Sequence, residues 1–244
     1  MVCAAAVGAG ASWYGVPVDG FQSAAQLTAV TAAMTPVDTG EAGCAEATTV
    51  LTKQQPGVQQ MARVQTENGY MYYAYSASMA EKGRNCVYVF EAASNRQQPL
   101  TVIENVAPAQ ATLQGVITHG ERLAVLARGE NCTYLRIYSI AEPTKPVLLS
   151  SIEQSGACVQ AGLVGENVYV LSHFVFDPKA EQSVPALTVN GEIRRALPEH
   201  IVRLAGANQA QYTVLGTVDV QTGKAVEAVA AVLGGGTKVP VSYT

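Results

Sequence analysis

The fold is decided by the stretch Tyr134–His173, which reads YLRIYSIAEPTKPVLLSSIEQSGACVQAGLVGENVYVLSH. Short runs rich in β-branched and aromatic residues alternate in it with turn residues, and no helical periodicity separates them. Pro143 and Pro146 bracket a tight connection, because proline fixes φ and donates no ladder hydrogen bond. Gly156 marks a bend, and Gly165-Glu166-Asn167 is a hairpin-turn signal. The stretch therefore predicts successive strands joined by turns.

The composition indicates a folded, β-rich chain. Of its 244 residues 48% are hydrophobic and 14% are charged. The charged share is well below the usual value of about a quarter, which argues against intrinsic disorder. The net charge is −4 with no long basic run, so nucleic acid is not expected as a partner. Eleven tyrosines against four phenylalanines suit half-exposed β surfaces.

The pattern of the quoted stretch recurs along the chain. VYVFEAASNRQQPLTVIE parallels LRIYSIAEPTKPVLLSSIE, with Pro99 and Pro146 47 residues apart. The turn glycines Gly69, Gly120 and Gly165 follow one another at steps of 51 and 45 residues, and Tyr212–Val232 repeats the strand-turn-strand unit. An all-strand repeat of this length is the signature of propeller blades. We therefore predict β-propeller blades over residues 58–244.

Residues 1–20 form an apolar leader. Its uncharged run VCAAAVGAGASW is shorter than the roughly 20 residues of a membrane span and lacks the basic start of a signal peptide. Three interpretations stay open: the remnant of a signal or membrane anchor whose start is missing, a disordered apolar leader, or a buried strand or helix. The first is the one we carry forward.

Residues 21–57 are expected to hold a short helix and a polar linker. Ser23 is a good N-cap, Leu27, Val30 and Met34 share one helical face, and Thr35-Pro36 ends the helix. The face is narrow and rich in alanine, so we expect it to pack on the domain edge.

An insertion without strong periodicity interrupts the blades at residues 177–209. It carries Pro185 and Pro198 together with several charged side chains, among them Arg194, Arg195 and Arg203. Long loops on a rigid scaffold are where binding usually resides, so this loop is a candidate binding segment.

A family resemblance supports the same fold. The segment SIEQSGACVQAGLVGENVYVLSHFVFDP resembles a segment, beginning IEQSGSYVSSRMIGDYLYLVTN, of secreted bacterial and archaeal proteins with a β-propeller domain distantly related to WD40 repeats. Further matches follow in the family's order over residues 58–243: ARVQTENGYMYYAY, THGERLAVLA, YSIAEPTKPVLLSSIE, QYTVLGTVDVQTGKA and VLGGGTKVPVS. The resemblance implies a secreted or anchored, WD40-like propeller module.

The sequence departs from the family at two polar segments. The family's SSRMIG stands here as QAGLVG at residues 160–165, and its acidic VDEAD opening is reduced to VQQMA at residues 58–62. The family continues through further blades beyond Thr244, so we expect a fragment truncated at the C-terminus. The predicted fold is all-β: a partial, unclosed propeller of about three four-stranded blades with a short N-terminal helix and an apolar leader.

No catalytic, cofactor-binding or metal-binding residue is predicted, and no cofactor. His119, His173 and His200 are accompanied by no nucleophile elbow, HExxH or phosphate-loop motif, so they are expected as surface or capping residues. The run LGGGT at residues 233–237 lacks the lysine and hydroxyl ending of a phosphate loop, which favours a blade turn. Asp177 and Asp219 are isolated acids, whereas calcium needs clustered oxygen ligands.

The five cysteines leave at least one thiol unpaired. They are Cys3, Cys44, Cys86, Cys132 and Cys158, and they form no CxxC pair, so a zinc site is not expected. Cys86 and Cys132 begin equivalent strands one blade apart, which leaves two alternatives: a disulfide between them, or two small side chains that pack separately. Asn131-Cys132-Thr133 fits the glycosylation pattern formally.

Three functional hypotheses remain. The leading one is a non-enzymatic, extracellular or cell-surface propeller that binds a protein or glycan through its loops. The second is part of a hydrolase or lyase whose catalytic residues lie beyond Thr244, and the third is a structural spacer or a nonfunctional fragment. The membrane is expected as a partner only through an N-terminal anchor, and self-association through unpaired blade edges is a further expectation.

Overall fold

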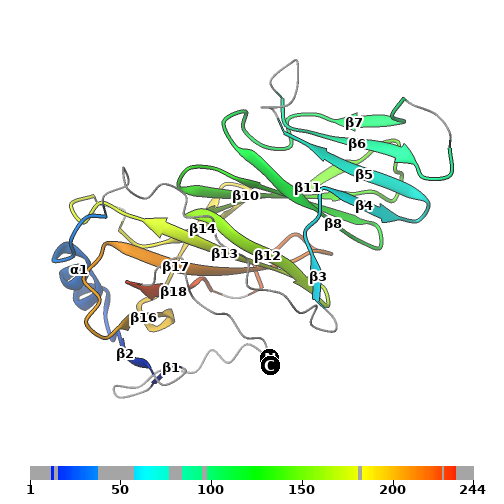
Figure 1. The fold of residues 1–244 in the computed structure, drawn as a ribbon. Helices are drawn as coiled ribbons and strands as arrows, with labels where there is room; N and C mark the ends of the chain where they lie inside the picture. The colour runs from blue at the N-terminus through cyan, green and yellow to red at the C-terminus, as the bar shows by residue number, and fades with distance from the viewer. Residues whose placement is uncertain are drawn as a thin grey trace.

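The computed structural model describes residues 12–13, 16–37, 58–76, 84–94, 98–180, 183–226 and 228–234. These residues form mostly antiparallel sheets and a single α-helix (Figure 1). In chain order the elements are β1 (Ser12–Trp13), β2 (Val16–Gly20), α1 (Ala24–Ala32), β3 (Val58–Gln60), β4 (Val64–Glu67), β5 (Tyr70–Tyr75), β6 (Cys86–Glu91), β7 (Thr101–Ile103), β8 (Thr112–His119), β9 (Arg122–Arg128), β10 (Cys132–Ser139), β11 (Val147–Ser155), β12 (Ala157–Val164), β13 (Asn167–Val175), β14 (Ala186–Val189), β15 (Glu192–Arg195), η2 (Pro198–His200), β16 (Ile201–Leu204), β17 (Gln211–Asp219) and β18 (Ala230–Leu233).

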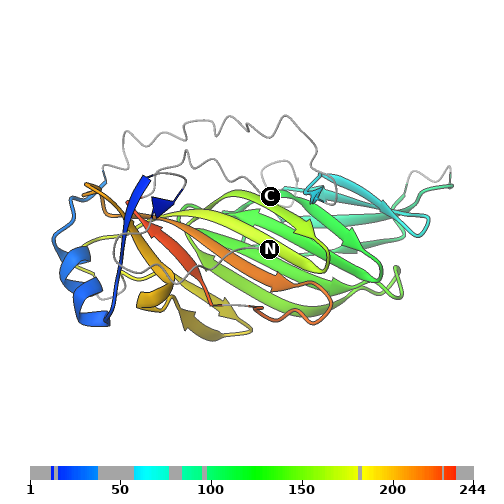
Figure 2. The same ribbon diagram turned by 90° about the horizontal axis from the view of Figure 1, so that it is seen from below.

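Three four-stranded antiparallel meanders make up the body of the molecule. Blade 1 is β4-β5-β6-β7, blade 2 is β8-β9-β10-β11, and blade 3 is β12-β13-β17-β18. Blade 1 and α1 lie at opposite ends of the molecule (Figure 1 and Figure 2). The three blades stack in an open series, as the repeat predicts. The predicted all-β, partial propeller with a short N-terminal helix is therefore confirmed.

Alternation along each strand sends neighbouring side chains to opposite faces of a blade, and two hydrophobic cores result. Between blades 1 and 2, Val87 and Val89 pack in one cluster with Leu123 and Val125. A larger cluster, which holds Leu126, Ile137, Val168, Val170 and Val214, fills the space between blades 2 and 3. Blade 2 is thus apolar on both faces, which explains the continuous apolar run LAVLA in β9.

The short segment that contains β3 and Ala62 pairs with strands of blades 2 and 3. Strand β3 pairs antiparallel with β12 of blade 3, and Ala62, just after it, bridges to Val116 of β8 in blade 2. The approach at Gly115 is close, because a Cβ on this residue would lie 2.8 Å from the carbonyl oxygen of Ala62. The segment therefore connects the inner strands of two blades before blade 1 begins.

The insertion at residues 177–209 is largely built into the sheets, so the expectation of an irregular loop there is wrong. Strands β14 and β15 form a hairpin that extends blade 2 through pairing of β14 with β11. Strand β16 then runs parallel to β18 and antiparallel to β2, extending blade 3. Strands of four residues are too short to show a clear period, and the open blade edges supply the backbone partners that stabilise them.

The N-terminal helix follows the prediction. The Ser23 hydroxyl caps α1 by accepting a hydrogen bond from the Gln26 amide at 3.2 Å. Leu27 and Met34 are buried in the core between blades 2 and 3, with Val30 packed against it. The helix therefore packs against the blades as expected.

Only part of the apolar leader lies within the described residues. Val16–Gly20 forms strand β2 on the extended sheet of blade 3, and Ser12–Trp13, at the end of the apolar run, forms β1 beside it. Residues 1–11 lie outside the described part of the chain. Among the described residues, no helix is long and apolar enough to span a membrane.

Candidate functional site

The outer half of one face of blade 2 is not covered by blade 1. On the inner strands of this blade, Leu123 and Val125 of β9 are at most 1% exposed because blade 1 packs on them. Farther out on the same face, Leu148 is 49% and Ile193 55% exposed. Cross-strand partners share a face, so the strand registers define this "outer face": Cys132, Tyr134, Arg136, Leu148, Ser151, Glu153, Ser155, Thr188, Ile193 and Arg195.

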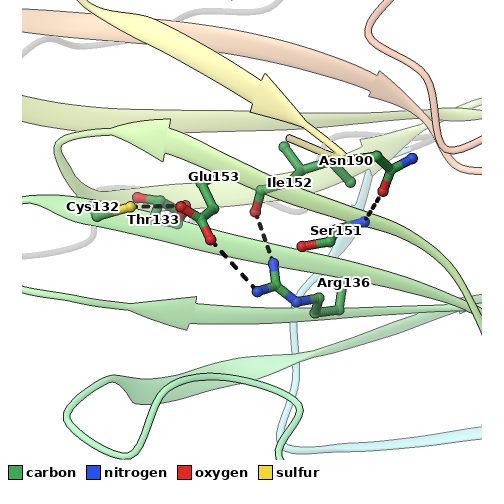
Figure 3. Close-up of polar contacts among 7 residues, drawn as sticks. All are labelled: Cys132, Thr133, Arg136, Ser151, Ile152, Glu153 and Asn190. Carbon is green, nitrogen blue, oxygen red and sulfur yellow. Dashed lines mark hydrogen bonds and ion pairs between the residues drawn. The ribbon is translucent and has the colours of Figure 1, made fainter. Parts of the chain in front are cut away.

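Arg136 lies on β10, the innermost of the four strands that form the outer face, and a hydrogen bond and an ion pair orient its side chain (Figure 3). Nη1 of Arg136 donates to the carbonyl oxygen of Ile152 at 3.2 Å, and Nη2 lies 3.7 Å from Oε1 of Glu153. The guanidinium carbon is 6.0 Å from the ring centroid of Tyr134. The Arg136 side chain is 15% and the Glu153 side chain 47% exposed, so the pair is partly buried and these contacts fix the orientation of the arginine.

The hairpin that completes the outer face is anchored to blade 2. The side-chain oxygen of Asn190, at the β14–β15 turn, accepts from the Ser151 amide at 2.8 Å (Figure 3). The Asn190 amide in turn donates to the Ser151 carbonyl at 2.8 Å. This reciprocal pair holds Ile193 and Arg195 of β15 in the same plane as Arg136. Arg195 is exposed and has no ion-pair partner among the described residues.

The outward side of blade 1 carries a second surface, which we call the tyrosine face: Val64, Thr66, Met71, Tyr73, Tyr75, Tyr88, Phe90 and Val102. Its rings contact one another, with Tyr75 and Tyr88 edge to face at 5.7 Å and Tyr88 and Phe90 stacked at 6.4 Å. Burial raises the pKa of Tyr88, with Cys86 and Tyr75 adding to the shift. Glu104, which forms an ion pair with Arg84 at 2.8 Å, also adds to the shift, so charged side chains border this surface.

Comparison with protein-family models adds an independent finding. The model described as "Beta propeller domain" matches residues 52–244. The chain belongs to this beta propeller family. No curated protein matches the chain. The relationship to WD40 repeats and to secreted bacterial and archaeal proteins stays a prediction.

The propeller's three histidines do not come together. His119 ends β8, His200 lies in η2, and His173 is in β13 with Nε2 3.0 Å from Oε1 of Gln211. Gln211 in turn donates to the side-chain oxygen of Gln209 at 2.9 Å, so this chain of hydrogen bonds includes no carboxylate. Within the described ranges no three His, Cys, Asp or Glu side chains are grouped to hold a metal ion.

The two isolated acids of the propeller cap turns. The carboxylate of Asp177 accepts from the Lys179 amide at 2.9 Å, and that of Asp219 from the Thr222 amide at 2.8 Å. The predicted glycine-rich turn begins as expected, since β18 ends at Leu233 and Gly234 has φ of 76°. The rest of that turn lies outside the described residues.

The side chains of the formal glycosylation sequence Asn131-Cys132-Thr133 form hydrogen bonds within the fold. The Asn131 side chain donates to the Val175 carbonyl at 2.7 Å and accepts from the Val175 amide at 3.3 Å. The buried Thr133 hydroxyl donates to the Gly156 carbonyl at 2.7 Å. Both side chains that an acceptor site needs are therefore engaged in joining blade 2 to blade 3.

The described cysteines are free thiols, so a disulfide between Cys86 and Cys132 is not present. Burial raises the pKa of the Cys132 thiol, with Glu153 as a second cause, so Cys132 is a poor nucleophile at neutral pH. Cys3 and Cys44 lie outside the described residues.

Sequence analysis missed both surfaces. The excess of tyrosine was the only available signal for the tyrosine face, and it did not indicate which side of a blade the rings would occupy. The outer face combines residues of β10, β11, β14 and β15, which come from separate parts of the chain. No local motif marks such a surface.

Proposed function

We propose that the chain is a non-enzymatic, extracytoplasmic propeller module that binds a partner protein through the outer face of blade 2. The observation that carries the proposal is that Arg136, held by a hydrogen bond, shares one face of the sheet with the exposed apolar side chains Leu148 and Ile193. Arginine and tyrosine are enriched where protein interfaces derive most of their binding energy. The predicted binding loop at 177–209 contributes through its hairpin, which forms part of this face.

The geometry favours a protein over a glycan. A sugar ring stacks on an open aromatic face, but the guanidinium of Arg136 already lies over the ring of Tyr134. The exposed leucine and isoleucine suit an apolar protein side chain instead. Arg195 adds a cation without a described partner, so the matching surface is expected to carry carboxylates beside an apolar residue.

The extracytoplasmic location is supported by the composition of residues 1–20 and by the resemblance to secreted proteins. Fusions made in the native gene, so that any residues before Met1 are retained, to alkaline phosphatase and to a fluorescent protein that folds only in the cytoplasm test it. Phosphatase activity with a dark fluorescent fusion is expected. A fluorescent fusion together with an inactive phosphatase fusion would contradict the proposed extracytoplasmic location.

The binding function is tested with two probe libraries. The purified chain is selected against displayed random peptides and is applied in parallel to a glycan array. We expect acidic peptides with apolar residues to be enriched, and the variants Arg136→Ala and Ile193→Ser each to lose at least tenfold in affinity for them. The control is Val226→Ser, which changes an apolar side chain that is 46% exposed, against 55% for Ile193, and lies outside the outer face.

Two outcomes contradict the proposal. Glycan binding without peptide enrichment would replace the protein partner by a carbohydrate. Peptides that bind equally well to the Ile193→Ser and Val226→Ser variants would move the site away from the outer face.

A further inference from the structure

Strand β15 forms an open edge of the sheet that carries the outer face. The strand order of this sheet is β15-β14-β11-β10-β9-β8, so among the described residues β15 pairs with another strand on one side only. All four of its residues are exposed. An edge strand presents unpaired N–H and C=O groups to any further strand that approaches it. The edge of β15 is therefore open to a strand from another molecule.

The hairpin register determines which backbone groups point to this open side. Just after β15, the Ala196 amide donates to the Pro185 carbonyl at 2.9 Å. Hydrogen-bonded residues alternate along an antiparallel pair with residues that are not, so Arg194, two positions earlier, also bonds to β14. The N–H and C=O groups of Ile193 and Arg195 therefore point away from β14, towards the open edge.

The same two residues place their side chains on the outer face. Ile193 is 55% exposed, and Arg195 is exposed without an ion-pair partner among the described residues. An extended peptide can use both kinds of group at once. Its backbone bonds to the edge, and every second side chain of it lies beside the outer face.

The charges of β15 favour an acidic peptide. On the side of the strand away from the outer face, Nε of Arg194 lies 3.3 Å from Oε1 of Glu192, so these two charges neutralise each other. The charge that remains is that of Arg195. Charged side chains on an edge strand repel strands of the same charge. A cation at this edge therefore excludes a basic strand and attracts an acidic one.

A second copy of β15 fits this edge poorly. When Ile193 of one copy pairs with Arg195 of the other in an antiparallel ladder, Arg194 lies directly opposite Arg194 of the second copy. Like charges in directly opposed positions destabilise a strand pair. The charge pattern therefore favours a different, acidic strand over self-pairing.

We propose that the partner protein of the outer face binds through an extended acidic segment, which adds to β15 as a further antiparallel strand. The inference rests on the proposed function and specifies how the partner is recognised. Antiparallel pairing is the slightly more stable direction. In this register a carboxylate of the partner lies opposite Arg195, and two residues later an apolar side chain lies opposite Ile193. The recognised segment therefore has the pattern acidic-x-apolar.

The test is amide hydrogen exchange of the 244-residue chain in the presence of synthetic peptides. The probe is Thr-Glu-Thr-Ile-Thr with both ends capped, and its control is Thr-Lys-Thr-Ile-Thr. At saturating probe we expect the Ile193 and Arg195 amides to exchange at least about tenfold more slowly, because they gain hydrogen-bond partners. The Arg194 amide already bonds to β14, so it is the internal reference and should not change. The lysine peptide should have no effect at the same concentration.

Methylation of the probe's backbone nitrogens tests the strand register without altering the protein. In the proposed pairing the glutamate and isoleucine amides of the probe donate to β15, whereas the amide of the central threonine points away. Methylation of either of the first two nitrogens should weaken binding at least about tenfold. Methylation of the central threonine should leave the affinity unchanged, and it is the matched control.

The outcomes separate this inference from the proposed function. If the probe binds and Arg136→Ala weakens it, but the Ile193 and Arg195 amides exchange as fast as before, the outer face is a binding site and strand addition is wrong. The same conclusion follows if all methylated probes bind equally well. If the probe does not bind and the displayed library enriches no acidic peptide, both the proposed function and the inference are wrong.

Discussion

Gly156 joins blade 2 to blade 3 at a point where no side chain fits. Its φ is +93°, and a Cβ would lie 2.6 Å from the carbonyl carbon and oxygen of His173. We expect Gly156→Ala to lower the free energy of unfolding by about 3 kcal/mol, because backbone strain and steric overlap add. Urea titration measures the change.

Gly165→Ala is the matched control for that substitution. Gly165 also has positive φ, but nothing lies within 4 Å of an added Cβ. The control is expected to lose only the roughly 1–2 kcal/mol of left-handed backbone strain. Equal losses at the two glycines would show that the contact with His173 is not tight.

Tyr212 carries a buried hydroxyl without a hydrogen-bond partner among the described residues. Its ring stacks on Phe174 and lies tilted against Phe176, and burial raises its pKa. Tyr212→Phe removes a desolvated polar group and keeps the ring, so we expect stability to be unchanged or to rise by about 1 kcal/mol. A loss of similar size in a thermal melt would show that the hydroxyl is bonded after all.

At the scale of elements, the segment after β3 connects the blades through a few backbone contacts. The Val116 amide donates to the Ala62 carbonyl at 2.7 Å, and the Ala62 amide donates back at 3.1 Å. Gly115→Ala would press on this carbonyl, so we expect the Val116 amide to lose protection from hydrogen exchange. The Val125 amide, in β9 of the same blade, is the internal reference and should keep its protection.

If both amides lose protection together in the Gly115→Ala variant, blade 2 as a whole has been destabilised. The segment would then be part of the blade's cooperative unit, and its separate role as a connection between blades would be contradicted.

At the scale of the whole molecule, the apolar cores predict a loss of stability in alkali. Burial raises the pKa of Tyr72 and of the Cys158 thiol each to about 12. The folded state therefore favours the protonated forms, and this stabilisation is complete below the unfolded pKa values of 10.0 and 9.0. It is lost as the pH rises from there towards 12.

Urea titrations between about pH 8 and pH 11 measure this dependence. The free energy of unfolding should fall above about pH 9, and Tyr72→Phe should make the fall shallower. An unchanged slope in Tyr72→Phe would mean that other groups govern the alkaline limit.

Local chemistry made much of the fold predictable. The turns at Asn68-Gly69 and Gly165-Glu166 adopt positive φ at their glycines, Ser23 caps the helix, and the strands of the quoted stretch appear close to their expected positions. The near-fifty-residue repeat predicted the blades, because each blade must bury the faces of a four-stranded meander against its neighbours. These features depend on residues close together in the chain.

The sequence by itself determined the strands, the turns and their grouping into blades, since strand periodicity and turn conformation are local properties. Only the tertiary structure decided which faces and edges stay open. Short strands such as β14 and β16 exist because distant blade edges accept them, and the face that Tyr73 and Tyr88 occupy depends on which side blade 2 covers. Both candidate surfaces depend on such non-local packing, because a face of a blade stays exposed only where no neighbouring blade packs on it.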